Sequence, residues 1–301
     1  KRGAYIHTCG YWDEVRYSAD KAQQLHKYNQ TAKGRPLKIG NDRAYAMFLE
    51  EKMLGVQADG RIDRRKRYSP AAALAEARKA GYRTSVCVST LYSYITKHVF
   101  LRLTNKDLWE KGKKKKQGHK TVRRIAHPAL PSIANRPEGI SQRAEPGHWE
   151  MDLVVGKEGK GPVLLTMVER KEREPLLFKL PDKRAESVRQ VFDTLERKMG
   201  KRRFRERFRT ITTDNGPEFL EYEKLVESIH GGERFRVYYC HSYSAWEKGS
   251  NENMNRMIRR WFPKGTDFSR VPKKEIAEFQ DWLYHYPRKV LGWKSPAELA
   301  L

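Results

Sequence analysis

The sequence predicts an α/β fold: a mixed five-stranded sheet with flanking helices, preceded by a helical region. From about residue 147 onward, strand-like and helix-like apolar segments follow one another in the order β-β-β-α-β-α-β-α, and a final helix comes after them. Three leading strands followed by alternation favour a mixed sheet with helices on its faces. Before residue 100 the pattern differs, because short apolar stripes at helical spacing end at glycines, which predicts short helices.

The charge balance indicates a polyanionic partner. The chain of 301 residues carries 62 Lys and Arg against 37 Asp and Glu, a net charge of +25. Such a field favours phosphate-rich ligands, above all nucleic acid. A membrane-surface protein is the competing class, but the charge runs through the whole chain and no apolar run approaches the roughly 18 residues of a span.

The three cysteines and the chain start bear on the compartment. Cys9, Cys87 and Cys240 lie far apart, which argues against a zinc site or a disulfide framework. A reducing cytosol is the natural compartment for such a chain. No signal-peptide pattern opens the sequence. Because it begins at Lys1 rather than at Met, further residues are expected upstream.

Cap residues place helices in the first hundred residues. Ser, Asn and Ser-Pro open helices because they satisfy or replace the first free N–H groups, and glycine ends them. The expected helices are Ser18 to about His26, Asn41 to Gly55, Ser69-Pro70 to Gly81, and Ser89 to about Lys97.

The last three of these helices are typical of a helix-turn-helix unit, expected at about residues 41–98 of a DNA-binding region over 1–100. In that interpretation the third helix enters the major groove. The residues facing DNA would be Ser89, Thr90, Tyr92, Ser93 and Lys97. The alternative is a small helical bundle that packs on the catalytic core without touching DNA.

Residues 101–145 are interpreted as a basic linker. They contain Lys113, Lys114, Lys115 and Lys116 among several prolines and glycines. Such a run is often only solvated. Here it is also a candidate to follow a phosphate backbone without reading bases.

The region 146–301 is the predicted catalytic domain. Its element order is the one expected for an RNase H-like core. The predicted strands are 149–155, 162–168, 176–180, 209–213 and 235–240, and the predicted helices are 188–199, 219–229, about 250–262 and about 271–285.

Three acidic residues are the candidate catalytic and metal-binding residues. Asp152 lies within the first of these strands, Asp214 follows the fourth, and Glu252 opens the helix at 250–262. The first and fourth strands are expected to be neighbours, so the three carboxylates would converge. Such a triad can hold two hard cations that clamp the attacking and leaving oxygens of a phosphodiester.

Each acid also has a plainer interpretation. Asp214-Asn215-Gly216 is turn chemistry, and Glu252 suits the dipole of a first helical turn. Asp152 is harder to dismiss, because an unpaired carboxylate in a buried strand is costly. Glu150 shares a strand face with Asp152 and is the substitute ligand if the register differs.

The helix at 250–262 adds candidate DNA contacts. Met254, Met257, Ile258 and Trp261 form a stripe that should face the sheet, which leaves Glu252, Asn255, Arg256 and Arg259 on the other side. The last three, together with Lys248 and Trp246, are expected to contact DNA. Trp246 belongs to an aromatic cluster that is either packing or a stacking surface for a displaced base.

These motifs resemble those of a known family. His148-Trp149-Glu150-x-Asp152-Leu153-x-Val155-Gly156-Lys157 resembles the first acidic motif of the transposases of the IS30 family of insertion sequences. The other matching segments are Val168-Glu169-Arg170-Lys171, Asp214-Asn215-Gly216-x-Glu218-Phe219, Tyr243-Ser244-x-Trp246-x-x-Gly249-x-Asn251-Glu252-Asn253, Phe262 to Asp267, and Pro287-Arg288-Lys289-x-Leu291-Gly292-Trp293-Lys294. The N-terminal half matches only thinly, and Ala245 and Glu247 depart from the usual proline and glutamine.

The resemblance implies a DDE transposase with Asp152, Asp214 and Glu252 as its triad. It implies two Mg²⁺ ions, for which Mn²⁺ is expected to substitute, and a further helix-turn-helix upstream of Lys1. The expected activity is binding of an element's terminal inverted repeats, cleavage that frees a 3′-OH, and strand transfer into target DNA. A homodimer or larger assembly in the cytoplasm at the nucleoid, with no membrane partner, is expected. The alternatives are a non-catalytic DNA-binding regulator and an RNase H-like nuclease acting on RNA–DNA hybrids.

Overall fold

A mixed five-stranded sheet organises the C-terminal half of the protein. The structure is a computed structural model, and it describes residues 4–9, 12–31, 37–109, 130–157, 161–241 and 244–300. The strand order is β5-β4-β3-β6-β7, with β3, β4 and β5 antiparallel and β3, β6 and β7 parallel. The strands are β3 (His148–Val154), β4 (Val163–Glu169), β5 (Pro175–Leu180), β6 (Thr210–Thr213) and β7 (Arg236–Tyr239). The predicted mixed sheet is confirmed, as is the pairing of β3 with β6.

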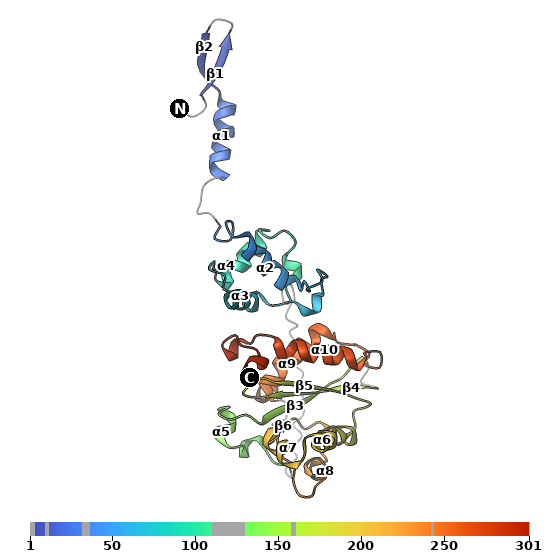
Figure 1. The fold of residues 1–301 in the computed structure, drawn as a ribbon. Helices are drawn as coiled ribbons and strands as arrows, with labels where there is room; N and C mark the ends of the chain where they lie inside the picture. The colour runs from blue at the N-terminus through green and yellow to red at the C-terminus, as the bar shows by residue number, and fades with distance from the viewer. Residues whose placement is uncertain are drawn as a thin grey trace.

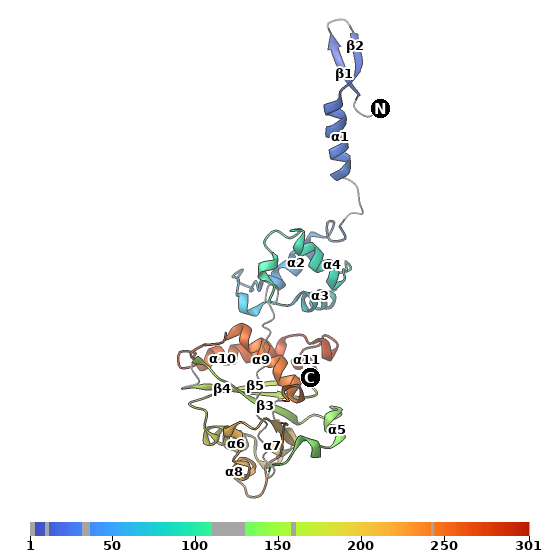
Figure 2. The ribbon, with the colours of Figure 1, turned by 180° about the vertical axis from the view of Figure 1, so that it is seen from behind.

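Helices cover both faces of this sheet. Figure 1 shows α6, α7 and α8 on one face and α9 and α10 on the other. Their bounds are α6 (Ala185–Met199), α7 (Lys201–Arg207), α8 (Tyr222–Val226), α9 (Gly249–Trp261) and α10 (Lys273–His285). Short helices α5 (Glu138–Ser141) and α11 (Pro296–Leu299) flank them (Figure 2).

Two apolar cores result, one on each face. Strand β4 shows why, because every one of its residues is buried. Val163, Leu165 and Met167 enter the core under α6–α8, whereas Leu164 and Val168 enter the core under α9 and α10. A central strand buried on both faces is expected to be a continuous apolar run. The predicted stripe of α9 is confirmed, since Met254, Met257, Ile258 and Trp261 are all buried in the second core.

Three helices form a separate small unit, here called the helical unit. They are α2 (Arg43–Leu54), α3 (Pro70–Lys79) and α4 (Val88–Thr96), and they enclose a core of their own. Ser69 caps α3 with Pro70 in the first turn, as predicted. No helix in the described part of the chain has the length and apolar character needed to cross a bilayer.

Two predicted caps of the helical unit are wrong by one or two residues. Asp42, not Asn41, caps α2, because its carboxylate accepts the Tyr45 N–H at 2.9 Å and the Thr84 hydroxyl at 2.5 Å. Cys87, not Ser89, caps α4, so Ser89 lies inside the helix. For α2 the helix begins where the contact with Thr84, outside the capping motif, fixes Asp42.

A hairpin and a helix precede this unit. The hairpin strands are β1 (Ala4–Cys9) and β2 (Trp12–Tyr17), which are not among the predicted elements. Helix α1 (Ala19–Thr31) begins at the predicted Ser18 cap and runs beyond His26. Both views show the hairpin and α1 projecting away from the remainder of the chain (Figures 1 and 2).

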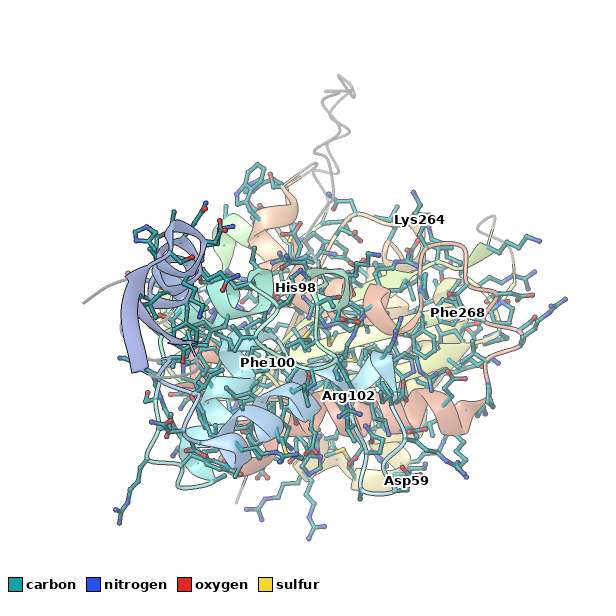
Figure 3. The ribbon with its side chains drawn as sticks, turned by 90° about the horizontal axis from the view of Figure 1, so that it is seen from above. Asp59, His98, Phe100, Arg102, Lys264 and Phe268 are labelled. Carbon is teal, nitrogen blue, oxygen red and sulfur yellow. The ribbon has the colours of Figure 1, made fainter. Side chains whose placement is uncertain are left out.

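The helical unit packs on the catalytic half. Ion pairs join Arg65 to Glu275 at 2.6 Å and Lys79 to Glu298 at 2.9 Å, and Ala72 of α3 enters the core under α9 and α10. Figure 3 looks down on this arrangement, with His98, Phe100 and Arg102 in the segment after α4 and Lys264 and Phe268 in the loop after α9. The predicted domain boundaries stay predictions, because the linker residues 110–129 lie outside the described ranges.

Candidate active site

Asp152 faces α9 from the middle of β3. Side chains alternate along a strand, so Met151 and Leu153 enter the opposite core while Glu150 and Asp152 share the α9 side. The Asp152 carboxylate accepts the Asn255 side-chain N–H at 2.8 Å and the Leu153 backbone N–H at 2.9 Å. Burial raises the pKa of this carboxyl group above its usual value, although the nearby Lys248 ammonium opposes the shift.

Asp214 follows β6, the parallel neighbour of β3, and shares a cation with Asp152. The Lys248 ammonium nitrogen lies 3.5 Å from Asp152 Oδ1 and 3.2 Å from Asp214 Oδ2. It also donates to the Met151 carbonyl at 3.3 Å, and its side chain is only 7% exposed. Burial alone would lower the pKa of Lys248, but the two carboxylates outweigh burial and raise it.

Asp214 forms the turn that the plainer interpretation predicts, and its carboxylate also takes part in the candidate site. Asp214 Oδ1 accepts the Gly216 N–H at 3.3 Å, and the Asn215 amide donates to the Cys240 carbonyl at 2.9 Å. These bonds fix the turn at the carboxyl end of β6. Asp214 Oδ2 remains available to the Lys248 ammonium, so the turn fixes the position of this carboxylate.

Glu252 is not brought to the two aspartates. It lies in the first turn of α9, where its side chain is exposed. Among the residues that the structure describes, no three His, Cys, Asp or Glu side chains are gathered closely enough to hold a metal ion. The structure therefore unites two of the three predicted acids, and the assignment of Glu252 stays a prediction.

The donor set at the aspartates nevertheless suits a divalent ion. Hard cations such as Mg²⁺ prefer carboxylate oxygens, and Asp152 and Asp214 each direct one oxygen at a single positive charge, which in this structure is the Lys248 ammonium. Asp152 and Asp214 are the residues that could hold such an ion.

Glu150 anchors α9 to the sheet. Its fully buried carboxylate accepts the backbone N–H groups of Ser250 at 2.9 Å and Asn251 at 3.0 Å, and the Arg170 guanidinium lies at 3.1 Å. An acidic group at a helix N-terminus is stabilised by the helix dipole. Glu150 is thus engaged by α9 rather than free as a substitute ligand.

Comparison with known proteins is informative over the same residues. The family model described as "Integrase core domain" matches residues 142–244, which include Asp152 and Asp214. The chain is 35% identical to the transposase of element IS4351 from Bacteroides fragilis over 61% of this chain and 53% of that protein. It is 36% identical to the transposase of IS1086 from Cupriavidus metallidurans, over 60% and 50% of the two chains.

A third relative is a transposase of IS30, the element that gives the family its name. The Escherichia coli transposase InsI of IS30C is 33% identical over 56% of this chain and 41% of that protein. The chain is therefore similar to transposases of the IS30 family over this region. It spans about half the length of the relatives it matches. The RNase H-like fold predicted for its catalytic half is confirmed by the sheet and by the integrase core match.

The residues expected to touch DNA occupy contrasting places in the structure. Ser89, Tyr92, Ser93 and Lys97 are exposed on α4 and Thr90 is half-buried, so that this helix presents a polar face to solvent. Arg256 is exposed, as is Trp246 at 73%. Lys113, Lys114, Lys115 and Lys116 lie outside the described residues.

Three of these candidates are not placed as predicted. Lys248 is buried at the aspartates, and Asn255 and Arg259 turn toward β3 rather than away from the sheet. The reason is that the buried stripe of α9 is wider than its apolar residues. Asn251 is fully buried and accepts the Thr166 hydroxyl at 3.2 Å, and Asn255 follows it one turn later. The sequence signal for this burial was the pair Asn251 and Asn255, two amides four residues apart that lie beside the apolar stripe of α9.

Proposed function

We propose that this chain acts as a DDE transposase that binds the terminal inverted repeats of an insertion sequence and catalyses strand cleavage and strand transfer. The observation that carries the proposal is the pair of carboxylates, Asp152 and Asp214, that adjacent parallel strands hold around one cation. Similarity to IS30-family transposases and the net charge of +25 support DNA as the substrate.

The cofactor belongs to this proposal. The family resemblance implies a divalent metal, and we propose two Mg²⁺ ions, replaceable by Mn²⁺, with Glu252 as the third ligand beside Asp152 and Asp214. When bound, the metal would lower the pKa of an attacking hydroxyl or water and stabilise charge on the phosphate.

The protein's own residues supply position and charge. The Asn255 amide holds one oxygen of Asp152, and Glu150 fixes the helix that carries both Asn255 and Glu252. The Lys248 ammonium balances part of the negative charge of the two aspartates. Two element ends must meet for strand transfer, so a homodimer or larger assembly is proposed, acting at the nucleoid in the cytoplasm.

Cleavage of duplexes that carry the element's ends tests the proposal. With Mg²⁺ we expect nicking at the element boundary, followed by joining to target DNA, and no products with EDTA. Glu252→Gln should bind the ends normally and lose cleavage. End binding without any nicking would instead favour a regulator, and cleavage of RNA–DNA hybrids in preference to duplex DNA would favour a nuclease.

A second prediction concerns α4 as the DNA-reading helix. Cys87 caps this helix, and hydrogen bonds with the Ser89 and Thr90 hydroxyls lower the pKa of its thiol to about 6. It is therefore mostly thiolate at pH 7, whereas burial raises the pKa of Cys240 to about 12. Iodoacetamide should label Cys87 at least about tenfold faster than Cys240, and saturating end DNA should slow that labelling several-fold.

Peptide mass spectrometry separates the cysteines and gives both rates. Unrelated duplex DNA at the same concentration is the control for crowding and weak binding. Labelling of Cys87 that end DNA leaves unchanged would show that α4 does not enter the groove, which would favour the packing-only alternative for the helical unit.

A further inference from the structure

A second basic site lies beside the first turn of α9, apart from the two aspartates. It is a cavity of about 730 Å³ whose lining includes Ser250 and Asn253 of α9, Ser69 at the start of α3, and the segment at Pro287-Arg288-Lys289. Neither Asp152 nor Asp214 lines it. The cavity thus joins the helical unit, the catalytic helix and a C-terminal motif that the catalytic proposal leaves without a role.

The lining of the cavity is strongly basic. Five basic side chains border the cavity and no carboxylate does, the five being Arg143, Arg173, Arg260, Arg288 and Lys289. Within the described ranges, no Asp or Glu lies at ion-pair distance from Arg143, Arg173 or Arg288. Like charges repel in a site of low dielectric, so the cluster calls for an anion.

Arg288 is the central member of the cluster. It is buried, with one terminal nitrogen 2.7 Å from Met257 Sδ and the other donating to the Leu283 carbonyl at 3.3 Å. Its Nε has no hydrogen-bond acceptor, and neither has the Nε of Arg173. Burial lowers the pKa of each of these two guanidinium groups to about 10, which still leaves both charged at neutral pH. Buried donors without acceptors require an explanation, and a ligand oxygen is one.

The backbone around the cavity is also constrained. Among the described residues, four that are not glycine have a positive φ angle, and Arg143 (φ 57°), Arg173 (φ 64°) and Trp293 (φ 68°) all line this cavity. The left-handed region costs free energy for such residues and persists where the surroundings enforce it, often at functional sites. Two of these three constrained positions carry guanidinium groups that line the same cavity.

We propose that this cavity binds a phosphodiester group of the DNA backbone close to the scissile bond. Guanidinium groups match phosphate oxygens with paired N–H donors, and contacts to phosphate set the register of a strand. Ser250 and Asn253 lie in the same helical turn as Glu252, which places the cavity beside the proposed third metal ligand. The inference rests on the proposed function for its substrate.

Salt dependence of binding tests the phosphate contact. The double variant Arg143→Gln/Lys289→Gln removes two charges from the half-buried and exposed parts of the lining. For a duplex that carries the element's ends, the slope of log K against log salt should become shallower by about 0.9 for the lost contact, with affinity down about tenfold. The matched double variant Arg202→Gln/Arg270→Gln, at positions 90% and 87% exposed, should keep the wild-type slope.

Arg288→Lys provides an independent measurement. Lysine keeps the positive charge but loses the planar set of N–H donors of the guanidinium group. We therefore expect weaker binding of the element's ends with an unchanged slope of log K against log salt. A melting temperature close to that of the wild type shows that the variant is folded. Stabilisation of the wild type by inorganic phosphate alone, without any change of DNA slope in the Arg143/Lys289 variant, would overturn the DNA assignment.

The outcome is separable from that of the proposed function. If the wild type cleaves ends with Mg²⁺ and the Arg143/Lys289 variant keeps the full slope, the phosphate site is wrong and the transposase proposal stands. If the variant loses slope while the wild type never cleaves, the cavity binds DNA phosphate and the catalytic proposal fails.

Discussion

Asp152→Asn should abolish strand cleavage while leaving the affinity for the element's ends intact. Asparagine has the size of aspartate, and its carbonyl oxygen can still accept the Leu153 N–H or the Asn255 amide, so the local fold is kept. What is lost is the negative charge that would hold a divalent ion. The expected loss is at least about 10³-fold, on the order of the cost of removing a central charge-stabilising group.

Asp214→Asn should have the same effect, because the two carboxylates act on one cation. The measurement is single-turnover nicking of labelled ends with Mg²⁺, alongside end binding by gel shift. Asp281→Asn, at a side chain that is 74% exposed on α10, is the matched control and should cleave normally. Cleavage within about tenfold of wild type in either variant would remove that residue from the proposed triad.

Lys248 determines how the aspartate variants behave without metal. Its ammonium is stabilised by both carboxylates, and replacing one of them leaves the buried charge with a single partner. Each variant should therefore be less stable than the wild type in EDTA, because a buried charge that loses a partner is costly. A melting curve in EDTA separates this structural effect from the catalytic one.

The sequence predicts the sheet well because its strands carry their own evidence. The apolar run of β4 is the expected pattern of a strand buried on both faces, and the acidic residue within β3 marks the side that meets α9. Parallel pairing of β3 with β6 then brings Asp152 and Asp214 to one edge. Each of these inferences needs only local periodicity and the usual topology of such sheets.

The remaining features depend on contacts that no local pattern contains. Lys248 precedes a glycine and has the appearance of a surface residue, yet carboxylates 96 and 34 residues away bury it. Helix α7 was not predicted because its seven residues include a single apolar side chain, Phe204. Asp42 rather than Asn41 caps α2, and this choice depends on a hydrogen bond from Thr84, which lies in the segment that leads into α4.

Glu150→Ala should cause the largest loss of stability among the single changes considered. The substitution removes the carboxylate that pairs with the buried Arg170 guanidinium. It also removes the acceptor of the Ser250 and Asn251 N–H groups, and alanine supplies no other acceptor. Removing one partner of a buried pair costs about 3–5 kcal/mol. The free energy of unfolding, from urea titrations followed by circular dichroism, should fall by that amount.

Two further variants identify the cause. Glu206→Ala removes an exposed carboxylate that pairs with Arg202 four residues away, and it should cost no more than about 0.5 kcal/mol. Glu150→Met/Arg170→Met removes both buried charges and should recover much of the lost stability. A cost below about 1 kcal/mol for Glu150→Ala would mean that water replaces the carboxylate and that Glu150 does not anchor α9.

The same variant also tests whether anchoring matters for catalysis. Helix α9 carries Glu252 and Asn255, and Lys248 immediately precedes it, so a displaced N-terminal turn would misplace all three. Below its melting temperature, Glu150→Ala should therefore cleave at least about 10²-fold more slowly than wild type, since misplacement by about 1 Å has effects of that order. The recovered stability of Glu150→Met/Arg170→Met should not restore cleavage, because methionine cannot accept the two backbone N–H groups that fix the helix.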